Sequence, residues 1–284
     1  MKRLSLIGLC VLFAATAFAG GNKNTTLDLE GLPDLVLSDN LGQQWVVRDE
    51  NLGANFCSVI EGGVEPGLRR LVRFTVQANN IGDADIFIGD PNDPSLADLF
   101  EFADCHHHHH FKNYATYALV DPRTGHTWRA AKRGFCMLDT DPVPTADGNA
   151  PPRARQFNSC GAIGIPGYQG ISAGWADTYR FFLGGQYFVL DGGDGQAPVP
   201  AGDYILRIHV NPPFSPDKRG NCARAKDPAT GLCHNFVESN YANNIGEVRI
   251  KIPSHPGRSG FGPMAGTAVP TEEHDEHDNK CAKK

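Results

Sequence analysis

The class of fold is decided by an alternating stretch at residues 71–78, which reads LVRFTVQA. Apolar side chains recur there at every second position, as at Val72, Phe74 and Val76. A period of two places these side chains on one face of a β-strand, whereas a helix would need a spacing of three or four. The stretch therefore predicts a strand with one buried face and one exposed face.

The same period recurs in the second half of the chain. Val248, Ile250 and Ile252 alternate with charged residues, which predicts a half-buried strand. Residues 204–210 predict a further strand that is entered through a Pro/Gly/Asp turn. Residues 181–190 predict another strand, interrupted by two adjacent glycines.

The composition also fits a protein that is rich in turns. Of its 284 residues 32 are Gly and 20 are Pro, and 40% are hydrophobic while 20% are charged. These values exclude a coiled coil, a helical bundle and a wholly disordered chain. Residues 139–170 form a Gly/Pro/Asn/Asp-rich segment longer than ordinary connections. We therefore predict an all-β fold, an antiparallel β-sandwich with long disulfide-stapled loops and few short helices.

The N-terminus has the features of a secretory leader. Lys2 and Arg3 precede the apolar residues 4–13, and residues 17–19 supply a small-residue cleavage pattern. The alternative is a membrane anchor, but an apolar run of about 16 residues falls short of the roughly 20 that a span requires. We expect a signal peptide over residues 1–19, a secreted or extracytoplasmic location (extracellular or periplasmic), and no membrane span in the mature chain.

The remaining boundaries follow from composition. We expect a linker at residues 20–30, one domain at residues 31–253, and a polar, disordered tail at residues 254–284. The formal net charge of −6 argues against a nucleic-acid partner and favours a basic substrate.

The cysteines indicate disulfides. An exported chain has seven cysteines beyond Cys10 of the leader, so three bridges leave one residue over. Cys222 and Cys233 enclose a short loop and are expected to pair, while Cys281 in the polar tail is the expected leftover. Zinc binding is the weaker alternative, because the Cys-x-x-Cys spacing does not occur.

Five consecutive histidines occupy residues 106–110. In an extended chain His106, His108 and His110 point to one face and the two others to the opposite face. Three imidazoles on one edge can share a metal ion. Cu(II) suits such a nitrogen-rich site, and Zn²⁺ with an open coordination position is the alternative that spacing does not separate from it. The other interpretations are an artificial tag and a surface polyhistidine stretch.

Several stretches together resemble the catalytic domain of the lysyl oxidase family. They span roughly residues 31–252 in the family's order and lie at residues 31–36, 71–74, 104–110, 131–140, 174–179, 202–212 and 240–244. The resemblance implies a copper amine oxidase with a lysine tyrosylquinone cofactor made from its own side chains. Lys132 matches the cofactor lysine and Tyr179 the cofactor tyrosine. His106, His108 and His110 match the copper ligands.

The implied reaction converts a primary amine into an aldehyde, with release of hydrogen peroxide and ammonia and consumption of O₂. The implied substrates are lysyl side chains of an extracellular protein, with small primary amines as the alternative. Asp177 lies two residues before Tyr179 and is our candidate for the base that removes the substrate proton. The competing interpretation is an Asp that caps a turn.

The resemblance has further implications for bridges and for calcium. It pairs Cys105 with Cys160, which leaves Cys57 for Cys136. Some relatives bind a structural calcium ion at the positions matched by Asp34, Asn243 and Asn244, so the resemblance also implies a calcium site at these residues. Asn240 replaces an acidic residue of those relatives, which should weaken a hard-cation site, and Asx turns at a strand junction are the alternative.

The chain also departs from the family. Trp175 occupies a position where relatives carry Cys, and the cysteine-rich end of the animal enzymes is replaced by the polar tail. Neither departure touches the proposed cofactor residues. Three other functions also stay open: a copper-binding module without quinone chemistry, a zinc hydrolase that uses the same histidines, and a structural module with a surface histidine run.

Overall fold

The computed structural model describes residues 31–132, 134–143, 154–255 and 260–267. Strands dominate, so the all-β prediction is confirmed. Within the described ranges α1 (Cys57–Ile60) is the single α-helix, joined by the 3₁₀ helices η1 (Asp39–Gln43) and η2 (Pro94–Leu96). No helix of these ranges is long and apolar enough to cross a membrane.

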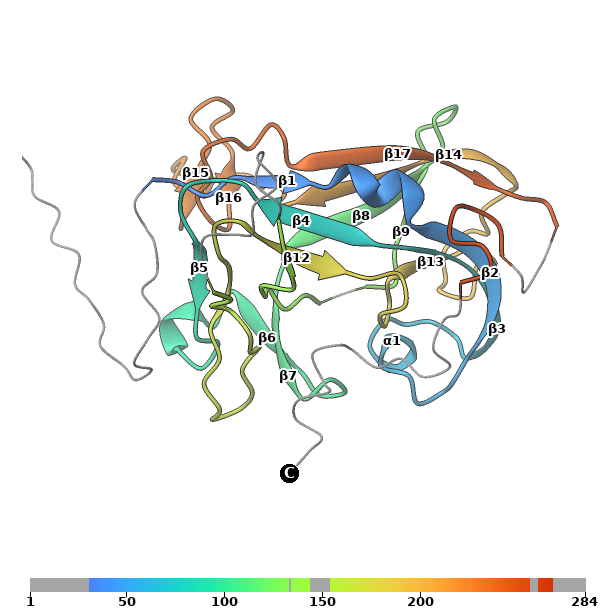
Figure 1. The fold of residues 1–284 in the computed structure, drawn as a ribbon, viewed down its shortest axis with the longest axis horizontal. Coiled ribbons are helices and arrows are strands. Elements are labelled where there is room, and N and C mark those ends of the chain that lie inside the picture. The colour runs from blue at the N-terminus through green and yellow to red at the C-terminus, as the bar shows by residue number, and fades with distance from the viewer. Residues whose placement is uncertain (1–30, 133, 144–153, 256–259, 268–284) are drawn as a thin grey trace, which may run out of the picture.

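One side of the molecule consists of two antiparallel sheets (Figure 1). The first has the strand order β1 (Leu35–Leu37), β4 (Val76–Asn80), β12 (Trp175–Tyr179) and β10 (Asp141–Pro142). The second has the order β13 (Tyr187–Val189), β3 (Gly67–Phe74) and β2 (Trp45–Leu52).

The opposite layer is the four-stranded antiparallel sheet β17 (Ile245–Ile252), β14 (Gly202–Val210), β8 (Ala115–Val120) and β9 (Thr127–Arg129). The main core lies between the layers, where Phe74 of β3 meets Tyr117 of β8 edge-on at 5.2 Å between ring centroids. In β14 every second residue, including Leu206 and Ile208, is buried. The alternating apolar residues of β14 and β17 therefore build one wall of a sandwich, as the sequence predicts.

Three small two-stranded sheets extend from this sandwich. They are β5 (Ile86–Gly89) with β11 (Gln169–Ile171), β6 (Phe100–Ala103) with β7 (His108–Phe111), and β15 (Ala225–Lys226) with β16 (Cys233–His234). The hairpin of β6 and β7 carries most of the histidine run.

The stretch at residues 71–78 differs from its prediction in one respect. Two strands share it, because β3 ends at Phe74 and β4 begins at Val76 in a different sheet. Thr75 lies between them and donates its N–H to Gln44 O. Both faces of the first half are buried, including Leu71 and Arg73, because the chain crosses the core as it passes from sheet to sheet. The prediction of a half-buried strand was therefore wrong for residues 71–74.

Residues 181–190 also form less strand than predicted. Only Tyr187–Val189 pair with β3, and the preceding residues form a turn in which Leu183 donates its N–H to Arg180 O. Gly185 has a φ of +70°, in the left-handed region that favours glycine. The two glycines therefore lie in the turn that precedes the strand rather than within the strand.

Three disulfides join Cys57 to Cys105, Cys136 to Cys160, and Cys222 to Cys233. The predicted local pair is confirmed, but pairing Cys105 with Cys160 and Cys57 with Cys136 was wrong. Helix α1 begins at Cys57 and lies beside the turn of the histidine hairpin, so that the Cα atoms of Cys57 and Cys105 are 5.5 Å apart. Cys136 and Cys160 are buried together in a separate small apolar cluster.

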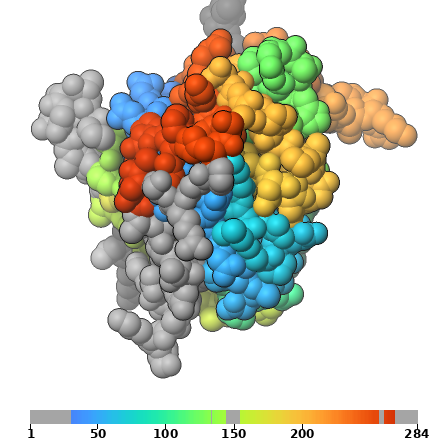
Figure 2. All heavy atoms as spheres, turned by 90° about the vertical axis from the view of Figure 1, so that its right-hand side faces the viewer, coloured from blue at the N-terminus to red at the C-terminus, as the bar shows by residue number. Residues whose placement is uncertain are grey.

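The packed part of the chain extends beyond the predicted boundary at residue 253. Phe261 forms a β-bridge with Val47 of β2, and the Arg48 guanidinium donates to Thr267 O at 2.7 Å. Phe261 also contacts the Trp45 ring at 6.3 Å between centroids, which explains why this segment docks. Figure 2, which faces the right-hand side of Figure 1, shows residues 260–267 in red at the surface. The predicted signal peptide, the linker and the rest of the tail lie outside the described residues.

Candidate functional site

The histidine run is divided between a turn and a strand. β7 begins at His108, which pairs with Ala103 of β6, so His106 precedes the strand. His107 has a φ of +56° and donates its N–H to Ala103 O at 2.8 Å. Few residues other than glycine adopt a positive φ, although His does so more often than most non-glycine residues. The turn at His107 therefore decides where His106 points.

Three imidazoles meet on one side of this hairpin. The ring centroids of His106 and His108 are 5.5 Å apart, and His110 is 5.0 Å from each. His108 and His110 are buried. His109 lies on the other face, where its ring contacts Phe102 at 5.2 Å. The grouping expected from alternation is therefore present, and three nitrogen donors at this spacing fit a Cu(II) or Zn²⁺ ion.

A carboxylate that the sequence did not suggest joins this cluster. Glu61, just after α1, places Oε2 2.9 Å from His106 Nδ1 and accepts the Cys105 N–H on Oε1 at 3.0 Å. The donor atoms of Glu61, His106 and His110 all lie within 4.8 Å of one another. No local signal could have found Glu61, because it lies 45 residues before His106 in the chain.

Lys132 and Tyr179 lie next to each other. The Lys132 Nζ atom is 4.9 Å from the centroid of the Tyr179 ring and 5.7 Å from that of Phe135. Tyr179 ends β12 and is buried, and its hydroxyl accepts from Cys136 N and donates to Cys136 O, both at 2.8 Å. The ring is thereby held with one face toward the amine.

The segment that follows Lys132 connects this pair to the imidazoles. Gly134 packs so closely on His110 that a Cβ atom there would lie 1.8 Å from the His110 Nδ1 atom. Phe135 O accepts the N–H of Phe111, at the end of β7. Glu61, His106, His110, Lys132 and Gly185 all line one small pocket. The fold therefore gathers the imidazole cluster, the amine and the phenol in one region.

Asp177 lies in the middle of β12 and is fully buried. Neither carboxyl oxygen makes a hydrogen bond of ordinary geometry to the described residues, so the turn-capping interpretation was wrong. Burial raises the pKa of Asp177 well above its usual range, whereas the Lys132 ammonium lowers it and Asp139 raises it further. A buried carboxyl with so perturbed a pKa, beside an amine, has the properties of an acid–base group.

Two tyrosines that the sequence did not single out face Asp177. Tyr114 and Tyr117 are buried, and burial raises the pKa of both phenols well above the usual value, with Asp177 adding to the shift. Both hydroxyls therefore stay protonated. The Tyr114 ring lies 6.4 Å from the Tyr179 ring, which makes these tyrosines part of the wall behind the Lys132–Tyr179 pair.

The residues of the expected calcium site meet where β1 approaches β17. Asn243 donates to Asp34 Oδ1 at 2.9 Å, and Asn244 donates at 2.8 Å to Glu238 Oε1. Glu238 is buried, which raises its pKa to about 7, and Asp34 adds to the rise. Asn240 is instead exposed and accepts the Ala242 N–H. The sequence analysis thus missed a buried carboxylate, Glu238, beside these residues.

The family model "Lysyl oxidase" matches residues 49–219. Similar proteins include "Lysyl oxidase homolog 2" of Homo sapiens, 27% identical over 80% of this chain, and "Lysyl oxidase homolog 3B" of Danio rerio, 29% identical over 85%. "Lysyl oxidase homolog 4" of Homo sapiens is 24% identical over 80%. The chain spans about a quarter of the length of these relatives, between 25% and 26%.

Proposed function

Because the chain belongs to the lysyl oxidase family, we propose that it is a copper-dependent amine oxidase. It converts a primary amine, O₂ and water into an aldehyde, ammonia and hydrogen peroxide. The observation that carries this proposal is the position of Lys132 Nζ, 4.9 Å from the centroid of the Tyr179 ring and on the segment that packs against His110. Lysyl side chains of an extracytoplasmic protein are the proposed substrates, with small amines as the alternative.

The same geometry supports the residues that the family resemblance assigns to the cofactors. His106, His108 and His110 would bind copper, and Lys132 with Tyr179 would form lysine tyrosylquinone. When present, copper supplies one-electron redox chemistry and the quinone supplies an electrophilic carbonyl for the amine. The chain orients these groups, since the two Cys136 hydrogen bonds hold the Tyr179 ring and the absence of a side chain at Gly134 leaves room for the His110 ring.

We assign the proton-transfer role to Asp177. Its burial keeps water away from the carboxyl, and its raised pKa gives its carboxylate the basicity that a general base needs. Lys132 moderates this shift. Tyr114 and Tyr117 present protonated phenols to the same carboxyl.

A secreted or extracytoplasmic location is supported by three disulfides, which form in oxidising compartments. For calcium, the supporting observation is chemical. The Oδ1 atoms of Asn243 and Asn244 are buried without a hydrogen-bond partner among the described residues, beside the Asp34 and Glu238 carboxylates. Oxygen donors of this kind suit Ca²⁺.

The decisive experiment is peptide mapping by mass spectrometry after aerobic reconstitution with copper. We expect a Lys132 peptide covalently joined to a Tyr179 peptide, together with peroxide release from butylamine that phenylhydrazine suppresses. Lys132→Arg should abolish both, whereas the control Lys112→Arg should abolish neither. A copper-loaded protein without the cross-linked peptide would instead be the copper-binding module, and bound zinc in the natively purified protein would favour the hydrolase.

A further inference from the structure

We propose that Glu61 is a positioning residue of the metal centre, which holds the His106 ring through Nδ1 so that Nε2 faces the other two imidazoles. This inference rests on the proposed binding of copper by the histidines. It adds to that site a residue from a different part of the chain, outside the histidine run.

The contacts of Glu61 are those of an orienting group. Oε2 lies 2.9 Å from His106 Nδ1, and Oε1 accepts the backbone N–H of the preceding residue, Cys105, at 3.0 Å. Both oxygens are thus engaged with the turn that carries His106. A carboxylate that accepts the second ring N–H of a metal-bound His fixes its tautomer and orientation and makes the ligand more basic.

His106 needs such support more than the other two histidines. His108 and His110 belong to β7, whose ladder with β6 sets their directions. His106 lies before that strand and is partly exposed. His107, which has a positive φ, separates it from the strand. Glu61 therefore orients a ring whose direction no strand ladder sets.

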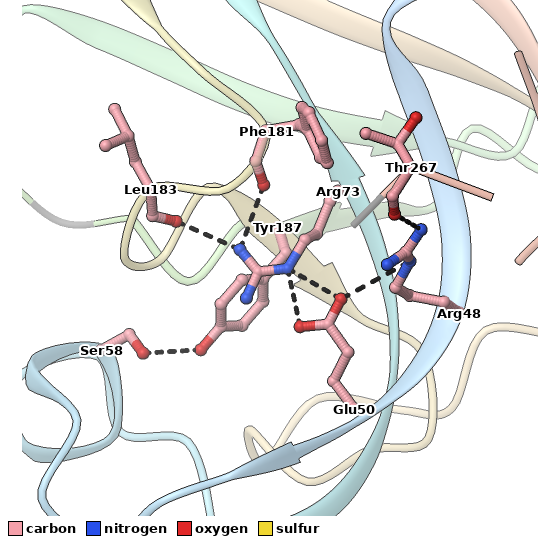
Figure 3. A network of polar contacts seen from close by, with 8 residues as sticks. All are labelled: Arg48, Glu50, Ser58, Arg73, Phe181, Leu183, Tyr187 and Thr267. Atoms are coloured by element: carbon pink, nitrogen blue, oxygen red, sulfur yellow. Dashed lines mark hydrogen bonds and ion pairs between the residues drawn. The ribbon is translucent and has the colours of Figure 1, made fainter. Parts of the chain in front are cut away.

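Glu61 is itself firmly held. Its N–H bonds to Cys57 O at 2.7 Å, and Cys57 is joined to Cys105 by a disulfide. Ser58, one turn earlier, shares a 2.7 Å hydrogen bond with the buried Tyr187 hydroxyl of β13, as Figure 3 shows. Helix α1 is therefore tied both to the histidine turn and to the sandwich.

Gly62 lets the end of helix α1 pack closely against the segment that carries Lys132. A Cβ atom at Gly62 would lie 2.2 Å from Ser58 O and 3.2 Å from Ala131 O, one residue before Lys132. The close approach keeps Glu61, His106 and Lys132 around the same pocket.

The test measures copper affinity of the metal-free protein by chelator competition, with the Cu(II) EPR spectrum as a second readout. Glu61→Gln and Glu61→Ala should each weaken copper binding by about 10–100-fold and alter the EPR parameters. Glu65→Gln, at an exposed carboxylate four residues along the chain, should change neither. The melting temperature of each metal-free variant reports on folding.

A double-substitution cycle separates positioning from a general structural role. If Glu61 acts through His106, Glu61→Gln should have no further effect on copper affinity in a His106→Ala background. The proposal is overturned if both Glu61 variants bind copper within twofold of wild type with an unchanged spectrum, or if the two effects are additive. Wild-type protein that binds no copper would overturn the proposed function as well, so the two failures are distinguishable.

Discussion

Arg73 and Asp177 are both buried in the sandwich, but the surroundings of Arg73 provide hydrogen bonds to its charge, whereas the described residues around Asp177 provide none of ordinary geometry. The Arg73 guanidinium bonds to Glu50 at 2.9 Å and to the carbonyls of Phe181 and Leu183, and it stacks over Tyr187 at 4.8 Å (Figure 3). Neither oxygen of Asp177 has a hydrogen bond of ordinary geometry within the described part of the chain.

The difference separates scaffold from site. A buried ion is tolerated in a scaffold when its partners compensate for the lost hydration. A buried carboxyl whose partners compensate only in part destabilises the fold, and such groups concentrate where chemistry is done. Arg73 therefore stabilises the frame around the site, whereas Asp177 is placed at a cost in stability.

The largest effect is expected at Asp177. Asp177→Asn should lower amine oxidation by about 10²–10⁴-fold, because it removes the proposed base. The free energy of unfolding should not fall, because a neutral amide replaces a poorly solvated carboxyl. Steady-state kinetics and urea denaturation measure the two. Asp141→Asn, at a partly exposed carboxylate, is the control. An Asp177→Asn enzyme that oxidises the amine within threefold of the wild-type rate would contradict the role of Asp177 as the base.

Arg73 should show the opposite behaviour. Arg73→Met should cost about 3–5 kcal/mol of unfolding free energy, because it leaves the nearly buried Glu50 without its main partner. Replacing Glu50 by Met as well should recover much of this loss. Urea denaturation monitored by circular dichroism checks both variants, and a single variant as stable as wild type would contradict the scaffold role.

Glu238 sharpens the contrast, because it is a buried carboxyl that does have partners. Its folded pKa of about 7 lies above the ordinary 4.5, so the folded state binds the proton more tightly than the unfolded state. This contribution to stability is complete below pH 4.5 and is lost as the pH rises through 7, by about 3 kcal/mol.

Unfolding free energies measured from pH 4.5 to pH 8 test this slope. Glu238→Gln should remove the contribution from the profile. Calcium should favour the carboxylate and stabilise the wild type most above pH 7. A wild-type profile with the same slope as that of the variant would show that Glu238 does not titrate in this window.

The smallest effect concerns hydroxyls in the core. Tyr117→Phe should change stability by less than about 0.5 kcal/mol, because its buried hydroxyl makes no hydrogen bond of ordinary geometry to the described residues. Tyr204→Phe should cost about 1 kcal/mol, because its hydroxyl donates to Pro200 O at 2.8 Å. Thermal denaturation compares the pair, and equal losses would mean that Tyr117 is bonded after all.

Much of the fold was predictable from short patterns. Period-two alternation located β14 and β17, and the same geometry grouped three of the five histidine rings. Alternation failed at residues 71–74 because both faces are buried where the chain crosses between sheets. The strand predicted at residues 181–190 was also too long, because a positive φ at Gly185 turns the chain before the strand begins.

Only part of the candidate site was predictable, because a local sequence pattern does not show which distant residues meet in the fold. Alternation grouped the histidines, whereas the resemblance to the lysyl oxidase family named Lys132 and Tyr179, and Asp177 was chosen for its place beside Tyr179. The fold brings all of them to one region. Glu61 and Glu238 were missed, because a single Glu carries no signal of burial or of a distant partner. Two of the three disulfide pairings were also beyond reach, because several pairings of the same cysteines satisfy the same spacing.

Local backbone geometry thus determined the all-β class and the shared face of the histidines, because both depend on side-chain direction within a few residues. Tertiary structure alone decided which cysteines pair across 48 and 24 residues, which carboxylate reaches His106, and which buried charge is compensated. These features arise when segments far apart in the chain close against each other. Such contacts depend on the packing of the whole core, which no single stretch of sequence encodes.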